Sequence, residues 1–432
     1  MALNILTRKL RRPSNAFLGG PGDVASVLPA LYGLSRGAKR GTPSWVPQPD
    51  CMTCGGGIQH ERERTASWLE ITYPFASDPE LRLLYQLGDG NTMRAGMFLE
   101  ELDAFSADCA LRHCESHEAL SHEALPGSTS KRHLTVVTAA HDGLALEPGV
   151  GLSALADLRL RGGVVSVGRT SMEVQTDLLR VIRFCPRAGE LHSSDHEREE
   201  YIGSCFTVMV ARELDHTASA LVPRLAGGES DAGEVEAAVA RNARRRQLAV
   251  TALALQPPSV EEVPVLHELW RRTRDGVSAE GVHVVPMQAS EHRAVDIQQP
   301  VHRNNNGFMF GGYLMRRALE VAWLSAFRLC RQPPRFAGLD DVVFKKPVVV
   351  GSMLEYVARV AFVCPNGSIR VLVEAQQLDL CSGKTELTNQ LHFVFESKSS
   401  GQMQVHPSTY EEGMVYLEGR RRWMHRSKRH KL

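Results

Sequence analysis

The chain has 432 residues, enough for two or three domains that each bury a core. Its 50 basic and 49 acidic side chains nearly cancel, so no global charge attracts nucleic acid, and an anionic ligand must be bound by local charge. No apolar run reaches the roughly 20 residues that cross a bilayer, so no membrane span is expected.

The two ends of the chain are basic and suggest different compartments. Residues 1–60 form a leader whose first forty residues hold many arginines and lysines but Asp23 as their one acid. Such a composition is typical of a mitochondrial transit segment, with an unstructured basic arm as the alternative. Residues 420–432 form a basic tail ending in HKL, which is similar to the peroxisomal address SKL. We expect the mitochondrial matrix, with a peroxisome-type organelle as the alternative.

A first unit is predicted over residues 61–225. The glycine-containing loop GDGNTMRAG opens a long apolar helix that includes LEELD, which ends at Asp103. Runs such as LTVVTAAHDGLAL and CFTVMVAREL then alternate or stay apolar over strand lengths. Between helix and strands lies the duplication SHEALSHEAL, Ser116 to Leu125, which predicts a solvated loop.

Residues 226–262 are predicted to link this unit to a second one. A Gly-rich joint leads into a charged surface helix around Glu234 to Gln247. Its arginine cluster, at positions 241, 244, 245 and 246, is interpreted as a solvated face, with contact to a ligand phosphate as the alternative.

The second unit, residues 263–419, repeats the order of the first. The stretch RNNNGFMFGGYLMRRALEVAWLSAF, Arg303 to Phe327, is again a glycine loop followed by a long apolar helix, and alternating runs follow it. A helix that is apolar nearly all round must be wrapped. The sequence therefore predicts an α+β fold in which a curved antiparallel sheet wraps one long helix, formed twice and joined through edge strands.

Four motifs in matching order identify a family. They are GDGNTMRAGMFLEELD, SVGRTSMEV (Ser166 to Val174), FGGYLMRRALEVAW (Phe310 to Trp323) and DDVVFKKPVVVGS (Asp340 to Ser352). Between about Trp68 and Gly419 the chain resembles the hotdog-fold acyl-CoA thioesterases, most closely the mitochondrial ones that carry two hotdog units. The resemblance implies a tandem hotdog fold, hydrolysis of acyl-CoA to fatty acid and CoA without a cofactor or metal, and a homo-oligomer assembled through the sheets.

Thioester hydrolysis needs a polarised carbonyl and an activated water. Gly311 and Gly312 expose backbone N–H groups at a helix start, where the macrodipole favours an oxyanion, although close packing is their alternative role. Gly311 is the better predicted donor. The resemblance implies that Asn304, or a neighbouring asparagine of the NNN run, contacts the thioester or the water, and that Asp103 is the base.

Each unit keeps a different half of this machinery. Leu319 occupies the place in the second helix that Asp103 occupies in the first, and Gly88 stands where the first unit would need an asparagine. One composite site is therefore predicted between Asp103 and Asn304, and its mirror site is predicted to be inactive. The sequence leaves open whether Asp103 activates water or forms a transient anhydride.

The resemblance also implies CoA contacts for Arg169 and Ser171, with Lys345 and Lys346 as a second possible contact. Two other functions are alternatives. A hotdog enoyl-CoA hydratase would need a His–Asp pair near the helix entrance, and no suitable histidine lies next to the glycines in the sequence. A non-catalytic acyl-CoA-binding protein would not need both Asp103 and Asn304.

Overall fold

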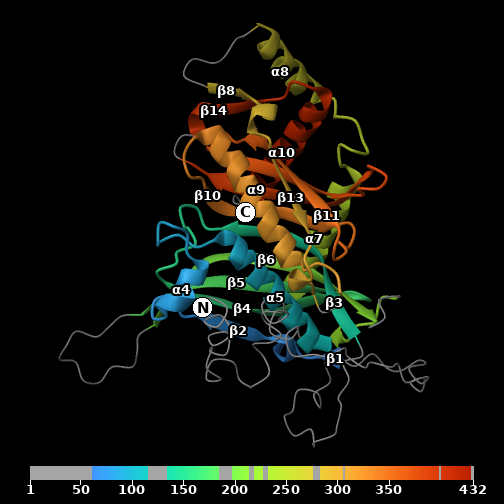
Figure 1. The fold of residues 1–432 in the computed structure, drawn as a ribbon. Coiled ribbons are helices and arrows are strands. Elements are labelled where there is room, and N and C mark those ends of the chain that lie inside the picture. Colours follow the sequence, from blue (N-terminus) through green and yellow to red (C-terminus); the bar gives the residue numbers. More distant parts are fainter. Residues whose placement is uncertain are drawn as a thin grey trace, which may run out of the picture.

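The computed structural model describes residues 61–114, 134–183, 197–213, 218–226, 232–275, 283–304, 307–397 and 400–429. Within these ranges a ten-stranded antiparallel sheet runs in the order β2-β4-β5-β6-β3-β10-β13-β12-β11-β9 (Figure 1). The predicted leader, the SHEAL duplication and the final HKL lie outside the described residues.

The sheet consists of two halves, each with one long helix. The first contains β2 (Leu69–Tyr73), α5 (Ala95–Cys114), β3 (Leu134–Leu146), β4 (Asp157–Val167), β5 (Ser171–Arg183) and β6 (Glu197–Glu213). The second contains β9 (His292–Ile297), α9 (Gly311–Cys330), β10 (Arg335–Phe344), β11 (Met353–Val363), β12 (Ser368–Leu378) and β13 (Thr385–Glu396).

The predicted order, in which the strands of each unit follow its long helix, is corrected by this arrangement. In each half one strand precedes the helix, and four strands follow it. The two leading strands, LEITY and HRAVDI, are short and lie at the two edges of the sheet. Their alternation was too brief to mark them against the surrounding turn residues.

The two halves join where β3 pairs with β10. His141 lies opposite Val342, and Leu144 lies opposite Leu339, in an antiparallel ladder that makes one continuous sheet. The pairing satisfies a row of backbone groups in each half that would otherwise be an exposed edge.

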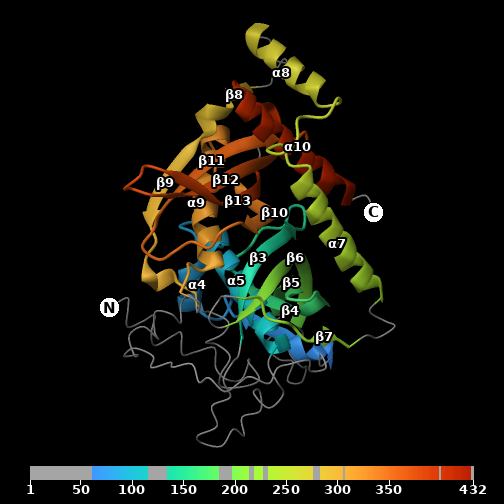
Figure 2. The ribbon, with the colours of Figure 1, turned by 90° about the vertical axis from the view of Figure 1, so that its right-hand side faces the viewer.

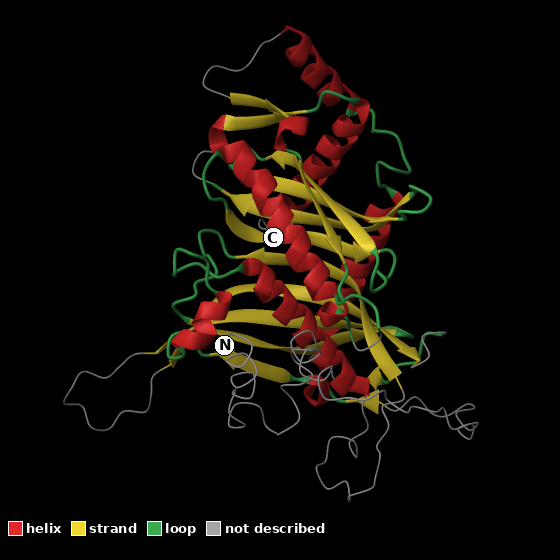
Figure 3. Ribbon diagram, viewed as in Figure 1, coloured by secondary structure: helices red, strands yellow, loops and turns green. Residues whose placement is uncertain are grey.

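Helices α5 and α9 lie on the same face of the sheet and pack against each other at their N-terminal halves (Figure 3). A Cβ on Gly96 would lie 2.6 Å from the Arg316 side chain, and one on Gly312 would lie 2.8 Å from the Glu100 Cα atom. The helix axes can approach so closely because both positions are glycine. Arg316 and Glu100 also form an ion pair at 3.1 Å.

A matching turn anchors the leading strand of each half. Ser67 ends the 3-10 turn η1 (Arg64–Ser67), and its hydroxyl accepts the Val164 N–H at 2.9 Å. Ser290 ends η3 (Met287–Ser290), and its hydroxyl accepts the Val360 N–H at 3.0 Å. These equivalent bonds support the repeat that the sequence predicts.

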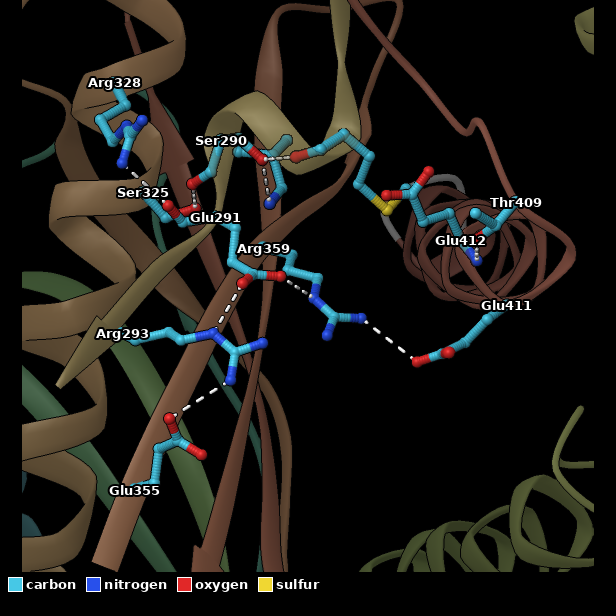
Figure 4. Close-up of polar contacts among 12 residues, drawn as sticks. Ser290, Glu291, Arg293, Ser325, Arg328, Glu355, Arg359, Thr409, Glu411 and Glu412 are labelled. Atoms are coloured by element: carbon cyan, nitrogen blue, oxygen red, sulfur yellow. Dashed lines mark hydrogen bonds and ion pairs between the residues drawn. The ribbon is translucent and has the colours of Figure 1, made fainter. Parts of the chain in front are cut away.

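In the second half, Figure 4 shows how the residue after η3 connects several elements. Glu291 pairs with Arg293 of β9 at 2.7 Å and with Arg359 of β11 at 2.8 Å. Arg359 extends on to Glu411 in α10 (Tyr410–Arg429).

The predicted surface helix is α7 (Ala232–Val250). Arg246 is exposed as expected, whereas Arg241 and Arg245 bond to the sheet and are not part of a solvated face. Glu173 of β5 points away from the long helices, because its neighbours Met172 and Val174 belong to the core. Arg241 and Arg245 pair with Glu173 at 2.6 and 2.9 Å, and Arg245 also pairs with Asp142 at 3.0 Å. The helix therefore covers the outer face of the first half through charge pairs (Figure 2).

The remaining elements lie around the sheet. They are β1 (Glu61–Arg62), α4 (Pro79–Tyr85), β7 (Arg224–Leu225), α8 (Val263–Asp275), β8 (His283–Pro286), η4 (Pro300–His302), η5 (Ser400–Gln402) and β14 (Met403–His406). Most of the predicted basic tail continues α10 as helix, and Arg421 pairs there with Glu262 at 2.6 Å. No helix within the described ranges is long and apolar enough to span a membrane.

Candidate active site

Asp103 is fully buried on α5 and is held by three donors from two other elements, β3 and α9. Its Oδ1 accepts the Thr138 hydroxyl at 2.7 Å and lies 3.1 Å from His141 Nε2. Its Oδ2 accepts the Gly312 N–H at 2.7 Å. A carboxylate from the first half thus meets the first turn of the long helix of the second half.

Gly311 and Gly312 differ in how their backbone N–H groups are used. The Gly312 N–H is bonded to Asp103, whereas the Gly311 N–H has no hydrogen-bond partner among the described residues. A Cβ on Gly311 would lie 2.9 Å from Asp103 Oδ2 and 3.2 Å from the ring of Phe344. Gly311 is half-buried and therefore offers an unpaired N–H donor beside a carboxylate and an aromatic ring.

Asn304 begins a tight turn seven residues before Gly311. Its backbone N–H donates to the Phe308 carbonyl at 2.7 Å, and its side-chain Oδ1 accepts the Phe308 N–H at 3.1 Å. Gly307 closes the turn with φ 81°, a backbone conformation that favours glycine. Asn305 and Asn306 lie outside the described residues.

His141 is a site residue that the sequence reasoning missed. Its Nε2 faces Asp103, and its Nδ1 lies 3.0 Å from the Thr207 hydroxyl, which lies 3.0 Å from the Ser106 hydroxyl. A register shift in the β3–β6 ladder just after Thr138 breaks simple alternation, so Thr138 and His141, three residues apart, both reach Asp103. The polar residues within an apolar run were the available signal.

The same ladder positions in the second half are apolar. Thr138 and His141 pair with Met209 and Thr207, and the ladder shifts after Thr138. The β10–β13 ladder shifts after Phe336 in the same way, which makes Phe336 the counterpart of Thr138, Leu339 that of His141, and Phe393 that of Thr207. These three side chains and Leu319, the counterpart of Asp103, are all buried.

The loop before α5 corrects the predicted counterpart of Asn304. The Leu87 N–H donates to the Thr92 carbonyl, as the Asn304 N–H donates to the Phe308 carbonyl. In the same way, the Gly90 N–H donates to the Leu87 carbonyl and the Gly307 N–H donates to the Asn304 carbonyl. The counterpart is therefore Leu87 and not Gly88, because the first loop is one residue longer. Neither residue carries an amide side chain.

The predicted CoA contacts lie on the surface. Arg169 is exposed in the tight β4–β5 turn, which the Gly168 N–H closes by donating to the Ser171 carbonyl at 2.7 Å. Lys345 and Lys346 are exposed directly after Phe344, where Lys345 donates to the Gln390 side chain at 2.7 Å and Lys346 pairs with Glu386. The lysines therefore lie directly after Phe344, whose ring borders Gly311.

The other acidic groups of the two helices have separate partners. Burial raises the pKa of Glu100 to about 7, although its Arg316 partner opposes the shift. Burial raises the pKa of Glu101 to about 8, and the hydroxyls of Tyr85 and Tyr73 donate to this carboxyl. Glu320 pairs with Arg317 on its own helix and lies 3.9 Å from Arg94 just before α5.

Among the described residues, no cluster of three His, Cys, Asp or Glu side chains could hold a metal ion. A buried carboxylate facing a helix N-terminus with an available N–H suits a hydrolase that polarises a carbonyl group. With one long helix on an antiparallel sheet in each half, these features define a protein of the hotdog hydrolase class.

Comparison with known proteins identifies the family. No family model matches the chain. It is 32% identical over 369 residues to human "Acyl-coenzyme A thioesterase 9, mitochondrial", which covers 83% of this chain and 77% of that protein. It is 31% identical to mouse "Acyl-coenzyme A thioesterase 10, mitochondrial", over 82% of this chain and 76% of that protein. The chain belongs to the acyl-coenzyme A thioesterase family.

A solved structure is also similar to part of the chain. The acyl-CoA hydrolase of Staphylococcus aureus, in complex with butyryl coenzyme A, coenzyme A and coenzyme A disulfide, is 26% identical. The match covers 34% of this chain and 93% of that one, with a TM-score of 0.33.

Proposed function

We propose that this protein hydrolyses acyl-CoA to a fatty acid and CoA at one composite site between its two halves. The observation that carries the proposal is the Asp103 carboxylate bonded to the Gly312 N–H beside the available Gly311 N–H. Membership of the thioesterase family supports the same reaction.

In the proposed reaction the thioester oxygen accepts the Gly311 N–H, so charge that develops on this oxygen lies at the positive end of α9. A carboxylate has about four acceptor positions, and on Asp103 three donors occupy three of them. The remaining position can accept a water. Asp103 takes a proton from this water, the hydroxide attacks the carbonyl carbon, the C–S bond breaks, and the CoA thiolate takes the proton.

The alternative path forms an anhydride. An Asp103 oxygen attacks the carbonyl carbon, CoA leaves as a thiolate, and water then hydrolyses the acyl–aspartyl anhydride. Both paths use the same donor at Gly311 and assign Asn304 to orient the thioester or the water. The bond from the Phe308 N–H fixes the orientation of the Asn304 side-chain amide.

Binding of CoA is assigned to cations at two strand ends. Lys345 and Lys346 follow Phe344, which borders the Gly311 donor, so a substrate leaving the site along β10 would reach them. Arg169 and Ser171 in the β4–β5 turn are the first proposed contact for the nucleotide, and the lysines are the second.

The hydratase alternative needs reassessment because a histidine does contact Asp103. No suitable histidine lies next to the glycines in the sequence, but the fold brings His141 to Asp103. This side chain is fully buried, and both of its ring nitrogens are engaged, by Asp103 and by Thr207. We therefore assign it to orient Asp103, and not to exchange protons with a substrate double bond.

At the scale of the chain, we propose a tandem hotdog. The first unit spans residues 61–225, the linker 226–262 and the second unit 263–419, with each sheet half wrapping one helix. Two equivalent halves of five strands support this division. We also propose a homo-oligomer assembled through the sheets and, following the mitochondrial relatives, a mitochondrial location in the matrix.

Thiol release from a panel of acyl-CoAs tests the reaction, since only a hydrolase liberates CoA. We predict that Asp103→Asn lowers kcat at least about a thousandfold, because the base or nucleophile is lost, while acyl-CoA binding measured by calorimetry persists. Glu320→Gln is the control and should change kcat less than about twofold. Equal losses in the two variants would contradict the single site.

A further inference from the structure

The arginine cluster of α7 includes one half-buried side chain without a partner among the described residues. The sequence leaves two roles open for this cluster, a solvated face and contact with a ligand phosphate. Arg241 and Arg245 are engaged by Glu173, and Arg246 is exposed. Arg244 is half-buried and its Nε atom is fully buried, yet its guanidinium makes no hydrogen bond or ion pair within the described ranges.

The C-terminal part of α10 lies beside the end of α7 (Figure 2). The Arg421 side chain of α10 donates to the Thr251 carbonyl at 2.7 Å, and Thr251 directly follows the last residue of α7. Arg244 precedes Thr251 by about two helical turns, or roughly 10 Å, which long side chains on the two helices can span. Arg422 follows Arg421 on α10 and is half-buried as well.

The guanidinium groups of Arg244 and Arg422 repel each other. Burial and the nearby positive charge of Arg244 together lower the pKa of Arg422 to about 10. Burial also lowers the pKa of Arg244, against the attraction of Asp142. Two positive charges therefore lie close together in a place where water solvates them only partly.

The acids nearby form their ion pairs with other arginines. Asp142 pairs with Arg245 at 3.0 Å, and Glu418 pairs with Arg422 at 3.0 Å, one turn away on α10. Arg244 is left without an ion pair, although a cation that is taken out of water is normally paired. Since this side chain is half-buried and not enclosed, an anion can reach it from the solvent.

A phosphate anion fits two guanidinium groups that come from different helices. Each guanidinium presents its N–H donors in a planar fork. A carboxylate has two oxygens in one plane and suits a single fork, whereas the oxygens of phosphate point in several directions and can accept from two forks at once. We propose that Arg244 and Arg422 bind a free phosphate anion where α7 meets α10.

The bound anion links the outer surfaces of the two halves. Helix α7 is attached to the first half through Glu173 and Asp142. Helix α10 packs on the second half, where a Cβ on Gly419 would lie 2.8 Å from the Phe362 side chain. Phosphate between the helices therefore stabilises the joined fold in proportion to its occupancy. Because α7 covers the sheet face opposite α5, the inference does not depend on the proposed reaction.

Calorimetry and melting curves with inorganic phosphate test the proposal. We expect the wild type to bind phosphate with a Kd of about 1 mM. Phosphate at about 20 mM should then raise the melting temperature by about 2 °C relative to chloride at equal ionic strength. Acetate should have a much smaller effect. An acetate effect as large as that of phosphate would overturn the proposal.

Two variants of α7 assign the effect to one side chain. Arg244→Gln should weaken phosphate binding at least about tenfold, because a charged fork of donors is lost. Arg246→Gln removes an exposed charge from the same helix and should change the Kd by less than about twofold. Equal binding by the wild type and Arg244→Gln would overturn the proposal.

Stability without phosphate separates an unpaired cation from a structural one. In chloride, Arg244→Gln should melt at the same temperature as the wild type or higher, since it removes a partly buried charge that lacks an ion pair. Phosphate should raise the melting temperature of the wild type and leave that of the variant almost unchanged. A lower melting temperature of the variant in chloride would show that Arg244 already stabilises the fold through the protein itself, and would overturn the proposal.

CoA also carries phosphates, so CoA binding distinguishes the two sources of this group. Calorimetry with CoA needs no turnover, and Arg244→Gln should bind CoA within about twofold of the wild type. Weaker CoA binding by the variant would assign Arg244 to the substrate and overturn the free-anion site. Phosphate binding is measured without acyl-CoA, so an absence of hydrolysis would contradict the proposed function alone.

Discussion

At the scale of single residues, the proposed chemistry depends on how Asp103 is oriented. His141 bonds to one oxygen of this carboxylate and is itself held by Thr207, whose hydroxyl adjoins Ser106. If Thr207 donates to Nδ1, the histidine is the tautomer with a proton on Nε2, which donates to Asp103. In this state the histidine is a positioning residue.

We predict that His141→Leu lowers kcat about tenfold or more with little change in KM, because one of the donors that fix Asp103 is lost. Leucine is the residue that the other half has at the equivalent position, Leu339. His141→Gln retains an N–H donor and should recover part of kcat. Steady-state kinetics with one acyl-CoA measures kcat and KM separately. A higher KM with an unchanged kcat would contradict the positioning role.

The raised pKa of Glu101 predicts how the stability of the fold depends on pH. Its pKa is raised from 4.5 to about 8 by burial, so the folded state binds a proton that the unfolded state releases above about pH 4.5. Its contribution to stability is complete below that pH and is lost as pH rises to about 8, by up to about 1.4 kcal/mol per pH unit. Glu100, with a pKa of about 7, acts in the same direction.

We therefore expect the melting temperature of the wild type to fall between pH 6 and 9, and to fall less in Glu101→Gln, which is neutral at every pH. At pH 9 the variant should be the more stable protein. If the melting temperatures of the wild type and of Glu101→Gln changed equally with pH across this range, Glu101 would not lose a proton there in the folded state.

At the scale of elements, charged pairs attach α7 to the outer face of the sheet. Glu173 is 5% exposed, and both Arg241 and Arg245 bond to it. When both arginines are removed, a carboxylate stays buried without its partners, which is strongly destabilising.

The double variant Arg241→Ala with Arg245→Ala should lower the free energy of unfolding by about 3 kcal/mol in urea titration. Arg246→Ala, on an exposed position of the same helix, is the control and should change it by less than about 0.5 kcal/mol. Adding Glu173→Met to the double variant should restore part of the loss, because the buried Asp142 still lacks its Arg245 partner. A double variant as stable as the control would mean that α7 is held by other contacts.

At the scale of the whole molecule, two similar halves contain one polar site. In the second half, Leu319, Phe336, Leu339 and Phe393 occupy the places of Asp103, Thr138, His141 and Thr207. The apolar set is buried and belongs to the common core. The mirror position is thus packed with side chains that cannot activate water.

We predict one binding site per chain for a thioether analogue of acyl-CoA in calorimetric titration. Leu319→Asp should not add a second site, since no Thr138 or His141 counterpart would bond the new carboxylate, and it should destabilise the fold by several kcal/mol. Two sites per chain, or higher turnover in Leu319→Asp, would contradict the assignment.

The sequence by itself determined the local features of this protein. Glycine loops before apolar runs predicted where α5 and α9 begin, and the motifs predicted the family. These features depend on neighbours along the chain, such as helix periodicity and the absence of a Cβ at Gly311 and Gly312. For the same reason, the sequence predicted that equivalent positions of the two helices hold a carboxylate, Asp103, in the first half and an apolar side chain, Leu319, in the second.

Only the tertiary structure decided which distant residues meet. His141 reaches Asp103 through a register shift, and Arg245 crosses to Glu173. Pairing between strands and packing between helices bring together residues far apart in the chain. Such contacts have no periodic signal in the sequence, because the free energy that selects them arises from burial and pairing in the assembled sheet.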